Sequence, residues 1–176
     1  MEETIMTDTD WREGIHAILK KLEITLVVYV PDAGHAQLIE KCLDDTDMDC
    51  FPLVNEFEAT GICTGAWLGG KRSCVLLQSS GVGNMINGLG LSKSTASPFF
   101  AITTMRGEWG EFNPWQISMG QSTQSVLEAS GVIVNRAERE EDVLSVVEAS
   151  AKLAFQSYVP VFALISQRIT GAKVFI

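Results

Sequence analysis

The most informative part of the sequence is residues 55–91, NEFEATGICTGAWLGGKRSCVLLQSSGVGNMINGLGL. It predicts a helix that begins at Glu56 and carries small residues on one side, where another backbone can approach closely. A carboxylate in the first turn of that helix is favoured by the helix macrodipole. An apolar strand is expected at 74–77, followed by a polar, glycine-rich turn at 78–84. Because α/β proteins present backbone to ligands where a glycine-rich turn follows a strand, we expect a binding site here.

Composition limits the classes of protein to which the chain can belong. The 176 residues are 46% hydrophobic and 20% charged, so we expect a single globular domain over residues 1–176. The formal charge of −9 argues against a nucleic acid or an anionic membrane as a partner. No apolar run is long enough to span a bilayer, and the acidic start of the chain does not resemble a signal peptide.

Histidine and cysteine content restricts the possible chemistry. His16 and His35 are too few for a histidine metal site or a Ser-His-Asp triad, and both are expected to be surface or half-buried residues. The four cysteines include no Cys-x-x-Cys pair and lie mostly in apolar surroundings. This pattern predicts buried free thiols and a reducing, cytoplasmic location.

Strand and helix patterns alternate along the whole chain. Strands are predicted at 24–30, 50–54, 74–77, 98–104, 131–134 and 159–165. Helices are predicted from a cap at Asp8, Thr9 or Asp10 to residue 22, from 35 to 43, from 56 onward, and at 84–93, 118–129 and 138–156. The short connections predict a three-layer α/β/α fold with a mostly parallel sheet of about six strands. Ligands of such sheets bind beyond the carboxyl ends of the strands.

Motifs spread over the chain resemble one family. The pattern NExxAxxxCxG at 55–65, followed by QSSGVGN at 78–84, resembles the pyrimidine-binding module of thiamine-diphosphate enzymes. The segments VPD at 30–32, MRGE at 105–108, NPWQ at 113–116 and SQRITGAK at 166–173 extend the resemblance to the α subunits of sulfopyruvate and phosphonopyruvate decarboxylases. The resemblance implies a pyrimidine-binding domain that forms half of the active site of a 2-oxoacid decarboxylase.

The resemblance also implies roles for single residues around the cofactor. Glu56 matches the glutamate that forms a hydrogen bond with N1′ of the cofactor's aminopyrimidine, and it is the predicted catalytic residue. Pro31, Gly81, Gly83 and Asn84 match positions beside the pyrimidine ring and are the predicted cofactor-binding residues.

The implied substrate is a small acidic 2-oxoacid with a sulfonate or phosphonate tail, sulfopyruvate being favoured because the enzyme is split into subunits. An anionic tail calls for a guanidinium partner, and Arg106 is the predicted one. Gln116 is predicted to donate to the substrate carboxylate and Asp32 to relay a proton. Each has a structural alternative: Arg106 forms a salt bridge with Glu108 or Glu111, and Asp32 caps a turn or helix.

The motif that holds the cofactor's diphosphate in this family is missing. It consists of Gly-Asp-Gly with asparagines further along, whereas residues 107–110 read GEWG. We therefore predict no metal ligand in this chain, and expect Mg²⁺ and the diphosphate of thiamine diphosphate to be held mainly by a partner β subunit. The assembly is expected to contain at least two copies of each chain.

Other interpretations of the same residues remain. A non-catalytic α/β binding or assembly subunit that kept the fold would use Glu56 only as a helix-start carboxylate. A flavodoxin-like nucleotide binder would need a phosphate loop after the first strand, where Pro31 and Asp32 stand instead. Trp109 and Trp115 either close a lid over the site or pack against a partner subunit.

Overall fold

The computed structural model describes residues 10–172, whose strands form one six-stranded sheet with the order β2-β1-β3-β4-β6-β5. The strands are β1 (Ile24–Tyr29), β2 (Asp49–Pro52), β3 (Arg72–Gln78), β4 (Phe99–Thr104), β5 (Ile133–Ala137) and β6 (Pro160–Ile165). Every neighbouring pair is parallel. The predicted architecture is confirmed, and the sheet is wholly rather than mostly parallel.

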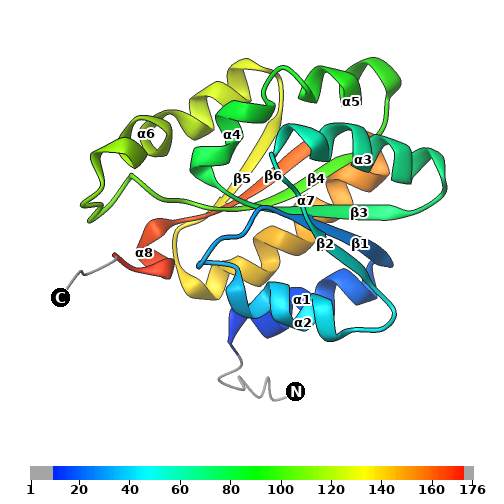
Figure 1. Ribbon diagram of the computed structural model, residues 1–176, viewed down its shortest axis with the longest axis horizontal. Coiled ribbons are helices and arrows are strands. Elements are labelled where there is room, and N and C mark those ends of the chain that lie inside the picture. The colour runs from blue at the N-terminus through cyan, green and yellow to red at the C-terminus, as the bar shows by residue number, and fades with distance from the viewer. Residues whose placement is uncertain (1–9, 173–176) are drawn as a thin grey trace, which may run out of the picture.

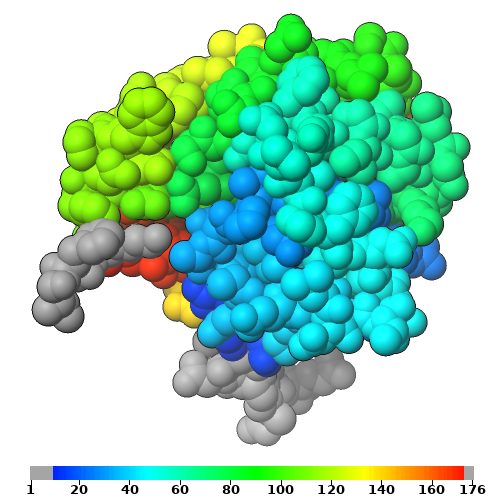
Figure 2. All heavy atoms as spheres, in the orientation of Figure 1, coloured from blue at the N-terminus to red at the C-terminus, as the bar shows by residue number. Residues whose placement is uncertain are grey.

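Helices cover both faces of the sheet (Figure 1). One face carries α1 (Trp11–Lys21), α2 (Ala36–Asp44) and α7 (Val143–Ser157), the last preceded by the 3₁₀ helix η1 (Glu140–Asp142). The other face carries α3 (Phe57–Leu68), α4 (Ser79–Met85), α5 (Leu89–Thr95) and α6 (Pro114–Ala129). A short helix that was not predicted, α8 (Gln167–Thr170), follows β6. In the space-filling view α8, in red, lies beside the blue segment that follows β1 (Figure 2).

Each side of the sheet has its own hydrophobic core. In β1, Val27 and Tyr29 join the core under α1, α2 and α7, whereas Leu26 and Val28 join the opposite core. Side chains alternate across a strand, so a strand buried on both faces needs apolar residues at consecutive positions. This explains the continuous apolar run that predicted the strand.

The glycine-rich segment differs from its prediction. We expected a turn over 78–84 and one helix over 84–93, but α4 begins directly after β3, and α5 is separate. Neither Gly81 nor Gly83 has a positive φ, so a turn conformation is not what these glycines provide. They allow close packing instead: an added Cβ would lie 2.1 Å from Oε1 of Glu56 at Gly81, and 3.3 Å from Sδ of Met119 at Gly83.

Several smaller predictions are tested by the described residues. The side chain of Asp10 caps α1 by accepting a hydrogen bond from the Arg12 amide, whereas Asp8 and Thr9 lie outside the described residues. The four cysteines are free thiols, three of them buried and Cys50 half-buried, as predicted. Within residues 10–172 no helix is both long enough and apolar enough to cross a bilayer.

Candidate cofactor and substrate site

The predicted site residues gather at one edge of the sheet. Because all six strands are parallel, their carboxyl ends share that edge, which is where ligands of such sheets bind. Asp32 follows β1, Glu56 lies between β2 and α3, Gly81 is in α4 after β3, and Arg106 follows β4.

Glu56, Gly81 and Asn84 form one unit. Glu56 is only 8% exposed, and its Oε2 accepts a hydrogen bond of 2.8 Å from Nδ2 of Asn84. Its carboxylate packs directly on Gly81, where any side chain would displace it. Oε1 accepts no hydrogen bond from the residues that the structure describes. One oxygen of the carboxylate is therefore held in place while the other is available to a ligand.

Asp32 is the centre of a hydrogen-bond network that joins three strand ends. Its carboxylate accepts from Nε2 of Gln78 (2.8 Å), Oγ1 of Thr104 (2.5 Å) and the amide of Gly34 (3.1 Å). Ser80 in turn donates to Oε1 of Gln78 at 2.9 Å. The expected turn-capping role of Asp32 is present in the bond to Gly34. Gln78 and Thr104 were not predicted as site residues, although each is the last residue of its strand.

His35 corrects another prediction. It was expected at the surface or half-buried, but it is fully buried, and neither of its ring nitrogens has a hydrogen-bond partner within residues 10–172. Burial lowers the pKa of His35, and the charge of Asp32 and the nearby backbone of Ile102 and Leu77 oppose this only in part. The fold therefore favours the neutral form of His35. His16, in contrast, is half-buried as predicted and contacts Asp45.

Arg106 forms the predicted salt bridge, and its partner is Glu111 rather than Glu108. Nε of Arg106 lies 2.9 Å from Oε2 of Glu111, and the two side chains are 17% and 4% exposed. Burial raises the pKa of Glu111, but hydrogen bonds from Arg106 and the Asn113 amide outweigh it, so the pKa lies below its usual value. The backbone of Arg106 is also fixed, since Ser79 Oγ bonds both its amide and its carbonyl at 2.9 Å.

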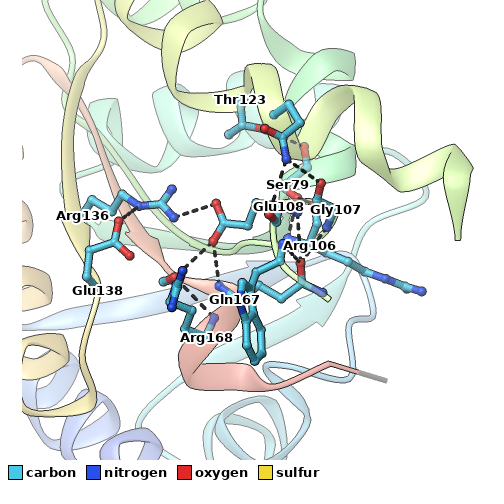
Figure 3. Close-up of polar contacts among 12 residues, drawn as sticks. Ser79, Arg106, Gly107, Glu108, Thr123, Arg136, Glu138, Gln167 and Arg168 are labelled. Carbon is cyan, nitrogen blue, oxygen red and sulfur yellow. Dashed lines mark hydrogen bonds and ion pairs between the residues drawn. The ribbon is translucent and has the colours of Figure 1, made fainter. Parts of the chain in front are cut away.

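The loop after β4 is fastened to α8 by a reciprocal pair of side chains (Figure 3). Oε1 of Gln167 accepts from three successive amides, those of Gly107, Glu108 and Trp109, at 2.9, 3.0 and 3.0 Å. In return, the Glu108 carboxylate accepts from the Gln167 amide at 2.8 Å and pairs with Arg136 at 2.6 Å. Sequence reasoning missed this arrangement, because its two halves are 59 residues apart.

The remaining predicted residues lie around the same edge. Pro31 and Asn84 are exposed to solvent. Gln116 is half-buried, and its Oε1 has no hydrogen-bond partner within the described part of the chain. Trp115 is 84% exposed and Trp109 is less exposed, so both rings are accessible to another molecule.

A cavity of about 110 Å³ lies beside the Asp32 network. It is lined by side chains from α1, from the ends of β1, β3 and β4, and from α8, among them Arg12, Asp32, Gln78, Thr104, Arg106 and Gln167. It adjoins the start of α4, whose Gly81 and Asn84 contact Glu56.

The site fits one end of thiamine diphosphate better than the other. The available oxygen of Glu56 suits the aminopyrimidine, which forms hydrogen bonds at its ring nitrogen. Residues 10–172 contain no group of three or more His, Cys, Asp or Glu side chains that could hold a metal ion. The part of the cofactor that the described donor set fits is thus the pyrimidine, at the Glu56 carboxylate.

Comparison with known proteins identifies the family to which the chain belongs. The family described as "Pyruvate flavodoxin/ferredoxin oxidoreductase, thiamine diP-bdg" matches residues 30–174, and the chain belongs to this thiamine-diphosphate-binding family. The fold of the 2-oxoglutarate:ferredoxin oxidoreductase of Magnetococcus marinus agrees, with a TM-score of 0.73 over 90% of this chain and 29% of that one, at 16% identity.

Relatives with similar sequences are named as decarboxylases. The sulfopyruvate decarboxylase subunit alpha of Methanococcus maripaludis is 30% identical over 154 residues, which make up 87% of this chain and 92% of that protein. The phosphonopyruvate decarboxylase of Streptomyces viridochromogenes is 37% identical over 112 residues, or 62% of this chain and 28% of that protein. The resemblance found from the motifs is therefore confirmed over most of the chain.

Proposed function

We propose that this chain is the pyrimidine-binding subunit of a thiamine-diphosphate-dependent 2-oxoacid decarboxylase that acts on sulfopyruvate or phosphonopyruvate. The observation that carries the proposal is the Glu56 carboxylate, which Asn84 and Gly81 hold at the carboxyl edge of the sheet with one oxygen available. The relatives named sulfopyruvate and phosphonopyruvate decarboxylase support the choice of substrate.

Glu56 is the catalytic residue in this proposal, because it holds the proton at N1′ of the cofactor's aminopyrimidine. Asn84 fixes one of its oxygens, so the other keeps a constant direction. Pro31, Gly81, Gly83 and Asn84 are the residues beside the pyrimidine. When bound, the cofactor supplies the electron sink that decarboxylation of a 2-oxoacid requires.

Arg106, Gln116 and Asp32 are the proposed substrate-binding residues. Arg106 binds the anionic substrate through the nitrogen that Glu111 leaves free, since only Nε and Nη2 contact Glu111. Gln116 donates to the substrate carboxylate through its amide. Asp32 relays a proton to the reacting carbon after carbon dioxide leaves, and the Gln78 and Thr104 hydrogen bonds hold it for that step.

A diphosphate-binding β subunit completes the site in this proposal and holds most of the ligands of Mg²⁺. The name "subunit alpha" of the relatives implies a partner chain, and we propose at least two copies of each. Apolar side chains flank Glu56, among them Val54, which is 93% exposed, and Phe57. The free thiols support a reducing, cytoplasmic location.

The test replaces Glu56 by glutamine in the chain mixed with its β subunit, and measures carbon dioxide release from sulfopyruvate and phosphonopyruvate. We expect a loss of more than about a hundredfold in kcat, because the amide cannot hold the proton at N1′. The complex should still assemble with the same stoichiometry. Full activity of the Glu56→Gln complex would contradict the assignment, and an inactive wild-type mixture would favour a non-catalytic assembly subunit.

A further inference from the structure

The cavity beside Asp32 contains an arginine that the sequence resemblance did not include. Arg12 lies in the first turn of α1, outside the residues 30–174 that the family shares, yet it lines the same cavity as Arg106. The two guanidinium groups are brought to one cavity from parts of the chain that are 94 residues apart.

Arg12 is held in place by several contacts. Its Nε donates to the Gly34 carbonyl at 3.3 Å, and its Nη1 lies 3.0 Å from the nearer carboxylate oxygen of Asp10. The guanidinium carbon stands 4.2 Å from the centre of the buried Trp11 ring. Nη2 has no acceptor among residues 10–172. A planar group fixed in this way has one side still able to bind a ligand.

Arg106 is also bonded on one side and has a free nitrogen on the other. Its Nε and Nη2 donate to Glu111, and its Nη1 has no acceptor among the described residues. Asp32 is the one carboxylate among the described residues that line the cavity, and both its oxygens accept hydrogen bonds, from Gln78, Thr104 and Gly34. The cationic groups that line the cavity with a nitrogen lacking an acceptor in the described part of the chain are the two guanidinium groups, and such donors bind an anion.

We propose that this cavity receives the sulfonate or phosphonate tail of the substrate, and that Arg12 is a specificity-determining residue for that tail. The inference rests on the proposed function and extends it. A tetrahedral group with three oxygens can accept from two separate guanidinium groups, whereas pyruvate has only a methyl group at the same position. Asp10 and Glu111 pair with the two arginines, and each guanidinium keeps one nitrogen without an acceptor among the described residues.

The test is Arg12→Gln in the complex of this chain with its β subunit, with kcat and KM measured for sulfopyruvate and phosphonopyruvate. We expect KM to rise at least tenfold for both while kcat changes less than about threefold, because the lost contact holds the tail and not the reacting carbon. The inhibition constant of pyruvate, which has no acidic tail, should stay unchanged. Arg12→Lys should raise KM less, since it keeps the charge but not the planar fork.

Lys21→Gln is the matched control. It also removes a charged side chain of α1, together with the ion pair of Lys21 with Glu148 at 2.9 Å, but Lys21 does not line the cavity. We expect its KM to stay within about twofold of the wild type. An equal rise of KM in Lys21→Gln and Arg12→Gln would show that Arg12 only stabilises α1, and would overturn the inference.

An unchanged KM in Arg12→Gln would overturn it as well. If Arg12→Gln does not fold, Arg12→Lys takes its place, and either an unchanged KM or a rise equal to that of the control variant would overturn the inference. A wild-type complex that releases no carbon dioxide would refute the proposed function, and this inference with it. Failure of the proposed function can be told apart from failure of this inference alone, because it is seen in the wild-type complex.

Discussion

At the scale of single residues, the position of the Glu56 carboxylate depends on the absence of a side chain at Gly81. Thiamine chemistry requires a proton to be placed at one ring nitrogen, and an error of about 1 Å in such a position costs about a hundredfold in rate. The family resemblance implied that Glu56, Gly81 and Asn84 would all lie around one pyrimidine ring. It did not predict that the glycine faces the carboxylate, because that contact depends on how α4 packs on α3.

Gly81→Ala should therefore inactivate the complex. The new Cβ would lie 2.1 Å from Oε1 of Glu56, so the carboxylate must move. We expect kcat/KM to fall about a hundredfold or more in a steady-state assay of carbon dioxide release. Gly65→Ala is the control, because it lies in α3 with no atom within 4 Å of the added Cβ. It should retain activity and gain up to about 1 kcal/mol of stability from helix propensity. Normal activity of Gly81→Ala would contradict the contact described here.

His35 should give the protein a characteristic dependence of stability on pH. Because burial lowers its pKa in the folded chain, only the unfolded chain binds a proton just below about pH 6.5. The free energy of unfolding should thus fall as pH decreases, by about 1.4 kcal/mol per pH unit from pH 6.5 down to the folded pKa. Urea unfolding at several pH values measures this slope. His35→Leu should flatten it, whereas His16→Gln should retain it; equal slopes in all three proteins would show that His35 is not the group responsible.

At the scale of elements, apolar patterns were sufficient to predict the order of strands and helices. Because the sheet is buried on both faces, its strands show continuous apolar runs that differ from the helical pattern. The patterns failed where distant contacts decide the structure. Glycine composition favoured a turn at α4, but Glu56 and Met119 pack against those glycines and a helix forms. The four-residue α8 has no local apolar pattern, and its first amide is satisfied by Glu108 from another part of the chain.

Gln167→Ala should loosen the loop after β4 without unfolding the sheet. The substitution leaves three successive amides, at residues 107–109, without their acceptor. We expect hydrogen exchange of these amides to accelerate at least tenfold while the amides of β4 and β6 keep their protection. Gln124→Ala is the control, since its side-chain amide donates to Glu128 on the surface of α6 and to no other side chain within residues 10–172. Unchanged exchange at 107–109 would mean that other contacts hold the loop.

At the scale of the whole molecule, the proposed function makes this chain one part of a shared active site. It provides the Glu56 carboxylate, the Asp32 network and two arginines at one edge of the sheet. Residues 10–172 provide no cluster of metal ligands, and exposed apolar side chains such as Val54, Phe57 and Trp115 lie in the segments that border this edge. Exposed apolar side chains at this edge are what the proposal of a second chain covering the pyrimidine requires.

The most direct test of this account is calorimetric titration of thiamine diphosphate with Mg²⁺ into this chain, into the β subunit, and into their mixture. We predict tight binding in the mixture only, accompanied by carbon dioxide release from sulfopyruvate or phosphonopyruvate. Tight binding to this chain alone would contradict a site shared between two subunits. A mixture that binds no cofactor would contradict the decarboxylase itself.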